Sequence, residues 1–222
     1  MSLSSADNSS AEHLLVSQEQ RFYRLGLPIS EANHVWICLH GYGQLAQFFK
    51  RKFSSVEDKV HLVFPEAAHR FYLDGNAGRV GASWMTKENR LTDIANQSRY
   101  LDALYSHVIG SSNAQVTVIG FSQGAAAASR WAFNTSYAID NLVLWSSAFP
   151  PDLQDIINEG FNADIHIMQL IGEHDPYLEG KKNEINSLFQ APSGQASDLM
   201  IFDGGHEIRP KELEIVLDRI LS

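Results

Sequence analysis

Hydrophobic positions along this chain follow two patterns. Short apolar runs rich in β-branched residues, typical of buried strands, occupy residues 34–39, 60–64, 115–120, 140–145, 164–171 and 198–202. Stretches with helix-forming or helically spaced apolar residues occupy 44–56, 88–109, 123–134, 178–190 and 210–221. Strands that alternate with helices form βαβ units. The pattern therefore predicts an α/β fold with a mostly parallel central sheet and helices on both faces.

Two segments lie outside this alternation. Residues 14–16 and 21–25 alternate weakly on either side of a polar stretch, which predicts an antiparallel pair. Residues 65–87 form the longest segment without a clear period, and we expect a functional loop there rather than a large lid domain. We expect the polar residues 1–10 to be disordered and residues 11–222 to form one domain.

The turn between the run at 115–120 and the helix at 123–134 carries the first chemical signal. Gly120-Phe121-Ser122-Gln123-Gly124 places a serine between two glycines at a strand-to-helix junction, which is the pattern of a nucleophile elbow. Glycine on either side leaves room for a tight turn. Taken alone, the five residues fit a serine that caps an ordinary helix equally well. Partners elsewhere in the chain must decide between the two interpretations.

Candidate partners follow two later strands. Asp175 follows the run at 164–171, and His206 follows the run at 198–202. The chain order Ser, Asp, His is that of α/β-hydrolases. Asp203 is an alternative acid only three residues from His206, but the sequence Asp-Gly-Gly is typical of a turn. We therefore favour Asp175 and leave Asp203 as the alternative.

A glycine-rich turn after the run at 34–39 completes the constellation. His40-Gly41-Tyr42-Gly43 occupies the place where these enzymes carry an oxyanion loop, and the second donor is the amide of the residue after the nucleophile. The pattern thus predicts the backbone N–H groups of Tyr42 and Gln123 as oxyanion donors. We expect His40 to support the loop by hydrogen bonds rather than to act as a second base.

Five segments together resemble the small phospholipase/carboxylesterase family of serine esterases. The likeness spans about residues 34–222 and implies an α/β-hydrolase fold, hydrolysis of carboxylic esters, in some members of lysophospholipids or acyl thioesters, and no metal. Motif by motif, it implies a triad of Ser122, Asp175 and His206 with oxyanion amides from Tyr42 and Gln123. The segments are Leu39-His40-Gly41-Tyr42-Gly43, Phe64-Pro65-Glu66-Ala67, Gly120-Phe121-Ser122-Gln123-Gly124, Gly172-Glu173-His174-Asp175-Pro176 and Gly204-Gly205-His206-Glu207-Ile208.

The chain departs from this family at two places near the expected site. Many relatives have an aspartate where this chain has Gln44, and many follow the tryptophan of the middle loop with Phe-Asp, where this chain has Trp84-Met85-Thr86. The triad chemistry is unaffected, but the resemblance does not carry thioesterase or lysophospholipase specificity to this chain.

Aromatic and apolar residues near strand ends are candidates for an acyl pocket, because ligands bind at the carboxyl ends of strands in α/β sheets. With no large lid, we expect an open pocket for short to medium acyl groups. The candidates are Phe71, Tyr72, Trp84, Met85, Trp145 and Phe149.

Composition narrows the possible partners. The net charge of −9 argues against nucleic acid, and the polar N-terminus together with the absence of a long apolar span predicts no stable membrane anchor. The single cysteine, Cys38, lies in a strand-like run and excludes an intrachain disulfide, which fits a cytoplasmic location. The nine histidines lack metal-ligand spacing, so we expect neither metal nor cofactor. A homo-oligomer is compatible with the sequence.

The sequence thus predicts a serine carboxylesterase that works through an acyl-enzyme. A thioesterase, a lysophospholipase or a small peptidase would use the same triad. From another class, a ligand-binding module could keep the fold without hydrolysis, although an intact triad argues against it.

Overall fold

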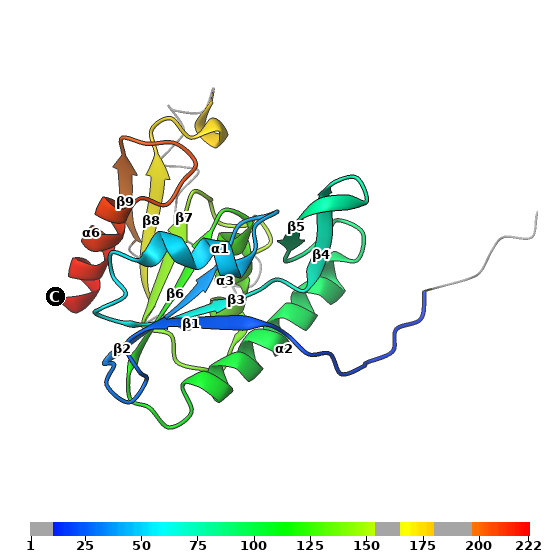
Figure 1. Cartoon of the computed structure of the whole chain (residues 1–222), viewed down its shortest axis with the longest axis horizontal. Helices are drawn as coiled ribbons and strands as arrows, with labels where there is room; N and C mark the ends of the chain where they lie inside the picture. The colour runs from blue at the N-terminus through cyan, green and yellow to red at the C-terminus, as the bar shows by residue number, and fades with distance from the viewer. Residues whose placement is uncertain (1–10, 154–164, 180–196) are drawn as a thin grey trace, which may run out of the picture.

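A seven-stranded mixed sheet forms the centre of the molecule (Figure 1). The computed structural model describes residues 11–153, 165–179 and 197–222. Within them the strand order is β1-β3-β2-β6-β7-β8-β9, and every neighbouring pair is parallel except β1 with β3. The strands are β1 (Phe22–Gly26), β2 (His34–Leu39), β3 (His61–Pro65), β6 (Gln115–Phe121), β7 (Asn141–Trp145), β8 (His166–Gly172) and β9 (Ser197–Phe202).

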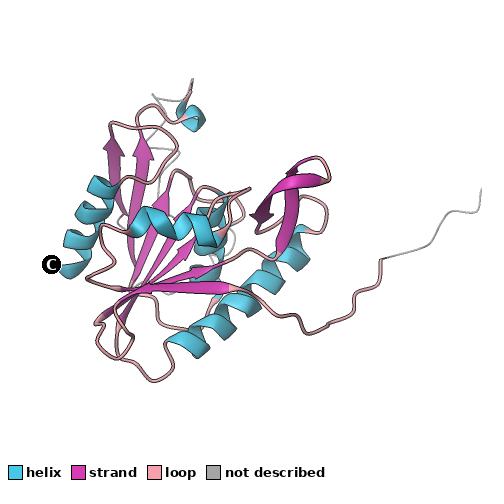
Figure 2. Ribbon diagram, viewed as in Figure 1, coloured by secondary structure: helices cyan, strands magenta, loops and turns pink. Residues whose placement is uncertain are grey.

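Helices cover both faces of this sheet (Figure 2). One face carries α2 (Arg90–Val108) and α3 (Gln123–Asn134); the other carries α1 (Ala46–Phe49), the 3₁₀ helix η1 (Lys50–Phe53) and α6 (Pro210–Leu221). Side chains of β2 alternate between the two layers: Ile37 and Leu39 face α2 and α3, whereas Trp36 and Cys38 face α1 and α6. The predicted α/β fold, with a mostly parallel sheet and helices on both faces, is therefore confirmed, and the described residues contain no large lid domain.

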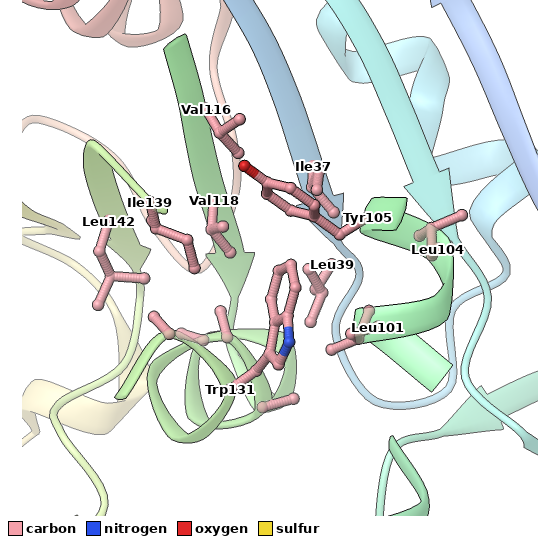
Figure 3. Close-up of a cluster of buried hydrophobic side chains, with 14 of the residues drawn as sticks. Ile37, Leu39, Leu101, Leu104, Tyr105, Val116, Val118, Trp131, Ile139 and Leu142 are labelled. Carbon is pink, nitrogen blue, oxygen red and sulfur yellow. The ribbon is translucent and has the colours of Figure 1, made fainter. Parts of the chain in front are cut away.

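Buried aromatic and aliphatic side chains pack between the sheet and helices α2 and α3 (Figure 3). Trp131 of α3 is fully buried between the sheet and α2, where its ring meets Tyr105 edge-on at a centroid distance of 6.4 Å. Its indole N–H donates to Asp102 at 2.8 Å. This packing fixes α3 against the sheet and α2.

The expected N-terminal antiparallel pair is wrong. Strand β1 pairs with β3, from Phe22 opposite Pro65 to Gly26 opposite His61, while residues 14–16 form no strand and are mostly exposed. Strand β1 completes the edge of the central sheet along β3, which a short segment at 14–16 does not provide.

Residues 65–87 also differ from the expected irregular loop. They contain an antiparallel hairpin of β4 (His69–Asp74) and β5 (Ala77–Ser83), which stands apart from the main sheet in Figure 1. Both faces of most of the hairpin are exposed, so its sequence has no hydrophobic alternation to signal a strand. Of the helix expected at 178–190, the described part contains only the end of the 3₁₀ helix η2 (Pro176–Leu178); residues 180–190 lie outside the described residues.

Candidate active site

Ser122 occupies the sharp turn between β6 and α3. Its backbone has φ 54° and ψ −119°, a conformation that costs a non-glycine residue free energy and persists only where the surroundings impose it. Here Ser122 N donates to Trp145 O at 2.8 Å, and Ser122 O accepts from Ala125 N at 2.9 Å. The Ser122 side chain makes no capping hydrogen bond to α3. The turn thus leaves the hydroxyl available, unlike that of a helix-capping serine.

The two glycines of the elbow are required by close packing. A Cβ on Gly120 would lie 2.4 Å from Ala125 Cα, and one on Gly124 would lie 2.3 Å from the carbonyl oxygen of Leu39. The first contact closes the turn on itself, and the second presses the start of α3 against the end of β2. Ser122 is therefore held beside the loop that follows β2.

Asp175 and His206 form a direct pair. His206 Nδ1 lies 2.8 Å from Asp175 Oδ2, and the other carboxylate oxygen accepts from Tyr177 N at 3.0 Å. The Asp175 side chain is fully buried. Asp203, by contrast, is 95 % exposed and lies 3.4 Å from His174 Nε2. The structure brings Asp175, and not Asp203, to the imidazole.

The loops that carry this pair are packed tightly against each other. A Cβ on Gly172, the last residue of β8, would lie 2.3 Å from the carbonyl oxygens of both Gly204 and Gly205, and His174 N donates to Gly204 O at 2.9 Å. The close contact requires glycine at 172, on the loop that carries Asp175.

Ser122 lines a cavity of about 480 Å³, and His206 packs against Tyr177 in its wall. The imidazole lies between the rings of Phe121 and Tyr177, at centroid distances of 4.9 and 5.0 Å, and Tyr177 lines the cavity together with Ser122. Within the described residues the Ser122 hydroxyl makes no hydrogen bond to His206, a contact that often tightens only when substrate binds. The cavity is lined by Tyr42, Ser122, Gln123, Ala126, Ser146, Ser147, Ala148, Ile171, Tyr177 and Leu178.

His40 supports the loop after β2. Its Nε2 accepts from Ala67 N at 3.1 Å, so the ring proton is on Nδ1, which donates to Gly41 O at 2.8 Å. Burial lowers the pKa of His40 and keeps the ring neutral. Gln44, at the position where many relatives carry an aspartate, accepts from Gly41 N at 3.0 Å. The loop around Tyr42 is thus fixed by neutral groups.

Comparison with known proteins decides the family. A family model described as phospholipase/carboxylesterase matches residues 26–221. The chain belongs to this family. It is accordingly a serine hydrolase of the α/β-hydrolase fold.

Solved structures agree on the fold. Esterase PE8 aligns with a TM-score of 0.69 at 19 % identity, covering 91 % of this chain and 98 % of its own. Acyl-protein thioesterase 2 of Zea mays aligns with a TM-score of 0.67 at 16 % identity, covering 91 % of this chain and 98 % of its own. A carboxylesterase from Mesorhizobium loti aligns with a TM-score of 0.63 at 16 % identity, covering 91 % of this chain and 94 % of its own. A search of curated proteins found no match.

The six residues predicted to form the acyl pocket of this family member lie elsewhere. Among the described residues, none of the six lines the cavity beside Ser122. Trp84 and Trp145 are buried in opposite core layers. The Phe71 ring packs on Tyr42 at a centroid distance of 5.2 Å, and Tyr72 is half exposed. The other two, Met85 and Phe149, contact Arg130 and Phe133 respectively.

The cavity walls come instead from the residues that follow the strand ends. Trp145 is the last residue of β7 and faces away from the cavity, whereas the next residue, Ser146, faces it. Ile171 and Leu178, on either side of Asp175, form another wall. Their positions in the sequence could have indicated this wall, because the residues directly after β7 and around Asp175 lie at the carboxyl edge of the sheet.

The described part of the chain has no group of three or more His, Cys, Asp or Glu side chains that could hold a metal ion. Among the same residues, none of the helices is long and apolar enough to cross a membrane.

Proposed function

We propose that this enzyme hydrolyses carboxylic esters through Ser122, with His206 as the base and Asp175 as the orienting acid. The observation that carries the proposal is the pairing of His206 with the buried Asp175, next to Tyr177, which lines the same cavity as Ser122 on its strained turn. The carboxylate holds the imidazole proton on Nδ1, which leaves Nε2 able to accept the proton of the serine. Ser122 then attacks the acyl carbon while His206 takes its proton.

The collapse of the tetrahedral intermediate follows from the same arrangement. His206 returns the proton to the departing alcohol oxygen, the ester bond breaks, and an acyl-enzyme remains on Ser122. Water, activated by His206, then attacks the acyl carbon, and the acid product leaves with the serine reprotonated.

The amides of Gln123 and Tyr42 are the proposed donors to the oxyanion. Gln123 is the first residue of α3, so its N–H has no partner within the helix and lies at the positive end of the helix dipole. Tyr42 lines the same cavity from the loop after β2. Two donors from different elements would thus face the carbonyl that Ser122 attacks.

The cavity supports small acyl groups as substrates. Its volume of about 480 Å³ is within the range of small-molecule sites, and Ala126, Ala148, Ile171 and Leu178 supply apolar surface. We propose short to medium acyl esters taken up as single molecules.

Ester turnover by the Ser122→Ala variant tests the proposal. Loss of a triad member removes several orders of magnitude in rate, so we expect hydrolysis of p-nitrophenyl butyrate to fall at least a thousandfold. Ser129→Ala is the matched control, because Ser129 lies buried in the same helix and its hydroxyl contacts only Ala126 O. Near-normal turnover by Ser122→Ala would overturn the proposal. A parallel assay with the butyryl thioester measures leaving-group preference.

A further inference from the structure

One segment, residues 81–85 at the end of β5, contacts both turns that carry the proposed oxyanion amides. We call it the bracket. The bracket includes Trp84 and Met85, which the sequence predicted as acyl-pocket residues. Trp84 is only 2 % exposed and belongs to the hydrophobic core. The contacts of the bracket fall on the loop around Tyr42 and on the side chain of Gln123.

The first set of contacts holds the backbone on both sides of Tyr42. Gly43 N donates to Ala82 O at 2.9 Å, and Ala82 N donates to Gln44 O at 3.0 Å. This short antiparallel bridge requires glycine at 81, where a Cβ would lie 2.4 Å from Gly43 O. The bracket thus fixes the chain directly after Tyr42.

The indole of Trp84 holds the chain before Tyr42. Trp84 Nε1 donates to His40 O at 2.8 Å, and the Trp84 and His40 rings lie 5.3 Å apart. Each residue has only two free backbone dihedrals. Hydrogen bonds to the residues on either side of a peptide group therefore restrict the direction in which its N–H points. The Gly41–Tyr42 peptide is itself held by His40 Nδ1, which donates to Gly41 O at 2.8 Å, and the bracket holds residues 40, 43 and 44 on either side of this peptide.

The second set of contacts reaches the nucleophile elbow through Gln123. Its side-chain oxygen accepts from Trp84 N at 3.0 Å, and its side-chain nitrogen donates to Met85 O at 3.1 Å and to Ser83 Oγ at 3.0 Å. The bracket therefore holds both the oxygen and the nitrogen of the Gln123 carboxamide. The carboxamide ties the first residue of α3, whose backbone N–H is the other proposed donor, to the same five residues.

We propose that Trp84 and the Gln123 side chain are positioning residues that align the two oxyanion amides with each other. The inference rests on the proposed function, because it assumes that these amides receive the oxyanion. Donor placement matters most when the charge develops, so a misaligned pair lowers kcat and leaves ground-state binding unchanged. The bracket also explains why the hairpin can be exposed along most of its length and buried only at its end.

The test compares Trp84→Phe with Trp131→Phe. Both changes keep an aromatic ring in the same core layer and remove one indole hydrogen bond of 2.8 Å, but Trp131 donates to Asp102 and has no contact with the oxyanion loop. For Trp84→Phe we expect kcat for p-nitrophenyl butyrate to fall about 10- to 100-fold with KM changed less than twofold, the size expected for misplaced catalytic donors. Trp131→Phe should retain kcat.

A second readout separates positioning from general loosening. A trifluoromethyl ketone forms a tetrahedral adduct with the serine, so its inhibition constant should rise with Trp84→Phe by the same factor as kcat falls. The corresponding non-reactive alcohol should bind unchanged. Gln123→Met, which removes the carboxamide but keeps the backbone N–H and the side-chain length, should behave in the same way and serves if Trp84→Phe does not fold.

The outcomes distinguish a failure of the bracket inference from a failure of the proposed function. If the wild-type protein hydrolyses the ester in a Ser122-dependent manner, but the bracket variant matches Trp131→Phe or alters KM alone, the bracket inference is overturned and the proposed function stands. If the wild-type protein fails to turn over esters and thioesters, the proposed function falls and the inference with it.

Discussion

Ser122 and Ser146 are the two non-glycine residues with positive φ in the described chain, and both have φ 54°. They follow the last residues of neighbouring strands, Phe121 and Trp145, which are paired in register. Each is fixed by a backbone bond to the next strand end: Ser122 N to Trp145 O at 2.8 Å, and Ser146 N to Leu170 O at 2.7 Å. The strained conformation of the elbow is thus imposed by the neighbouring strand ends rather than by the pentapeptide alone.

Replacing each candidate acid by its amide separates their roles. Asp175→Asn should lower kcat/KM for p-nitrophenyl butyrate by roughly a thousandfold or more, because an amide in contact with Nδ1 favours the wrong imidazole tautomer. Asp203→Asn should change it less than about threefold, because the Asp203 side chain is 95 % exposed and faces His174. Circular dichroism and thermal melting would check that both variants fold. The reverse order of effects would assign the role to Asp203.

At this scale the sequence was informative for motifs and uninformative for side-chain direction. The pairing of Asp175 with His206 follows the predicted chain order, because short loops at neighbouring strand ends carry both residues. Trp145 was chosen as a pocket residue although Ser146 lines the cavity, since a shift of one residue along a strand reverses the face. Sequence period does not reveal where a strand ends.

Among the elements, an ionic cluster links the cavity wall to the helix behind the nucleophile. The side chain of Arg130 in α3 is only 4 % exposed and donates to both carboxylate oxygens of Asp152 at 2.8 Å. Arg90, at the start of α2, donates to Asp152 Oδ1 at 2.8 Å. Asp152 follows the 146–148 wall by only a few residues. The hydrogen bonds from Arg130 are the main reason that the pKa of Asp152 is lowered to about 2.

This lowered pKa predicts an acid-sensitive contribution to stability. The carboxyl titrates near 3.8 in the unfolded chain and near 2 when folded, so its contribution is complete above about pH 4 and is lost as the pH falls from about 3.8 to 2. Asp152→Asn should therefore be less stable than the wild type in urea unfolding at pH 6, and the gap should narrow by pH 3. A gap of equal size at both pH values would contradict this role of Asp152.

Elements in the centre of the sheet were predictable and those at its margins were not. The run at 34–39 coincides with β2, because a fully buried strand needs a continuous apolar run. The β4–β5 hairpin was missed, since its strands are held by backbone pairing and by the turn at Gly75 with φ 67°, neither of which leaves a hydrophobic period. The pairing of β1 with β3 depends on which sheet edge is open, and local sequence does not contain that information.

For the whole molecule, the strand order explains how distant residues come to lie at one edge of the sheet. Strands β6, β8 and β9 end in the loops that carry Ser122, Asp175 and His206, and β7 lies between the first two. Because these strands are parallel, all three loops lie at the same edge of the sheet. The cytoplasmic location, the lack of a nucleic-acid partner and the oligomeric state stay predictions from composition.

The central claim is that Ser122 is the nucleophile, and covalent labelling tests it most directly. The cavity also contains the hydroxyl-bearing residues Ser146 and Ser147, so the site of modification must be mapped rather than inferred from lost activity. The full chain would be treated with an alkyl fluorophosphonate, assayed for ester turnover and digested for peptide mass spectrometry. We predict one phosphonyl group per chain, on Ser122, with turnover lost in proportion to labelling. A label on Ser146 or Ser147, or ester turnover that persists in a chain fully labelled at Ser122, would contradict the account.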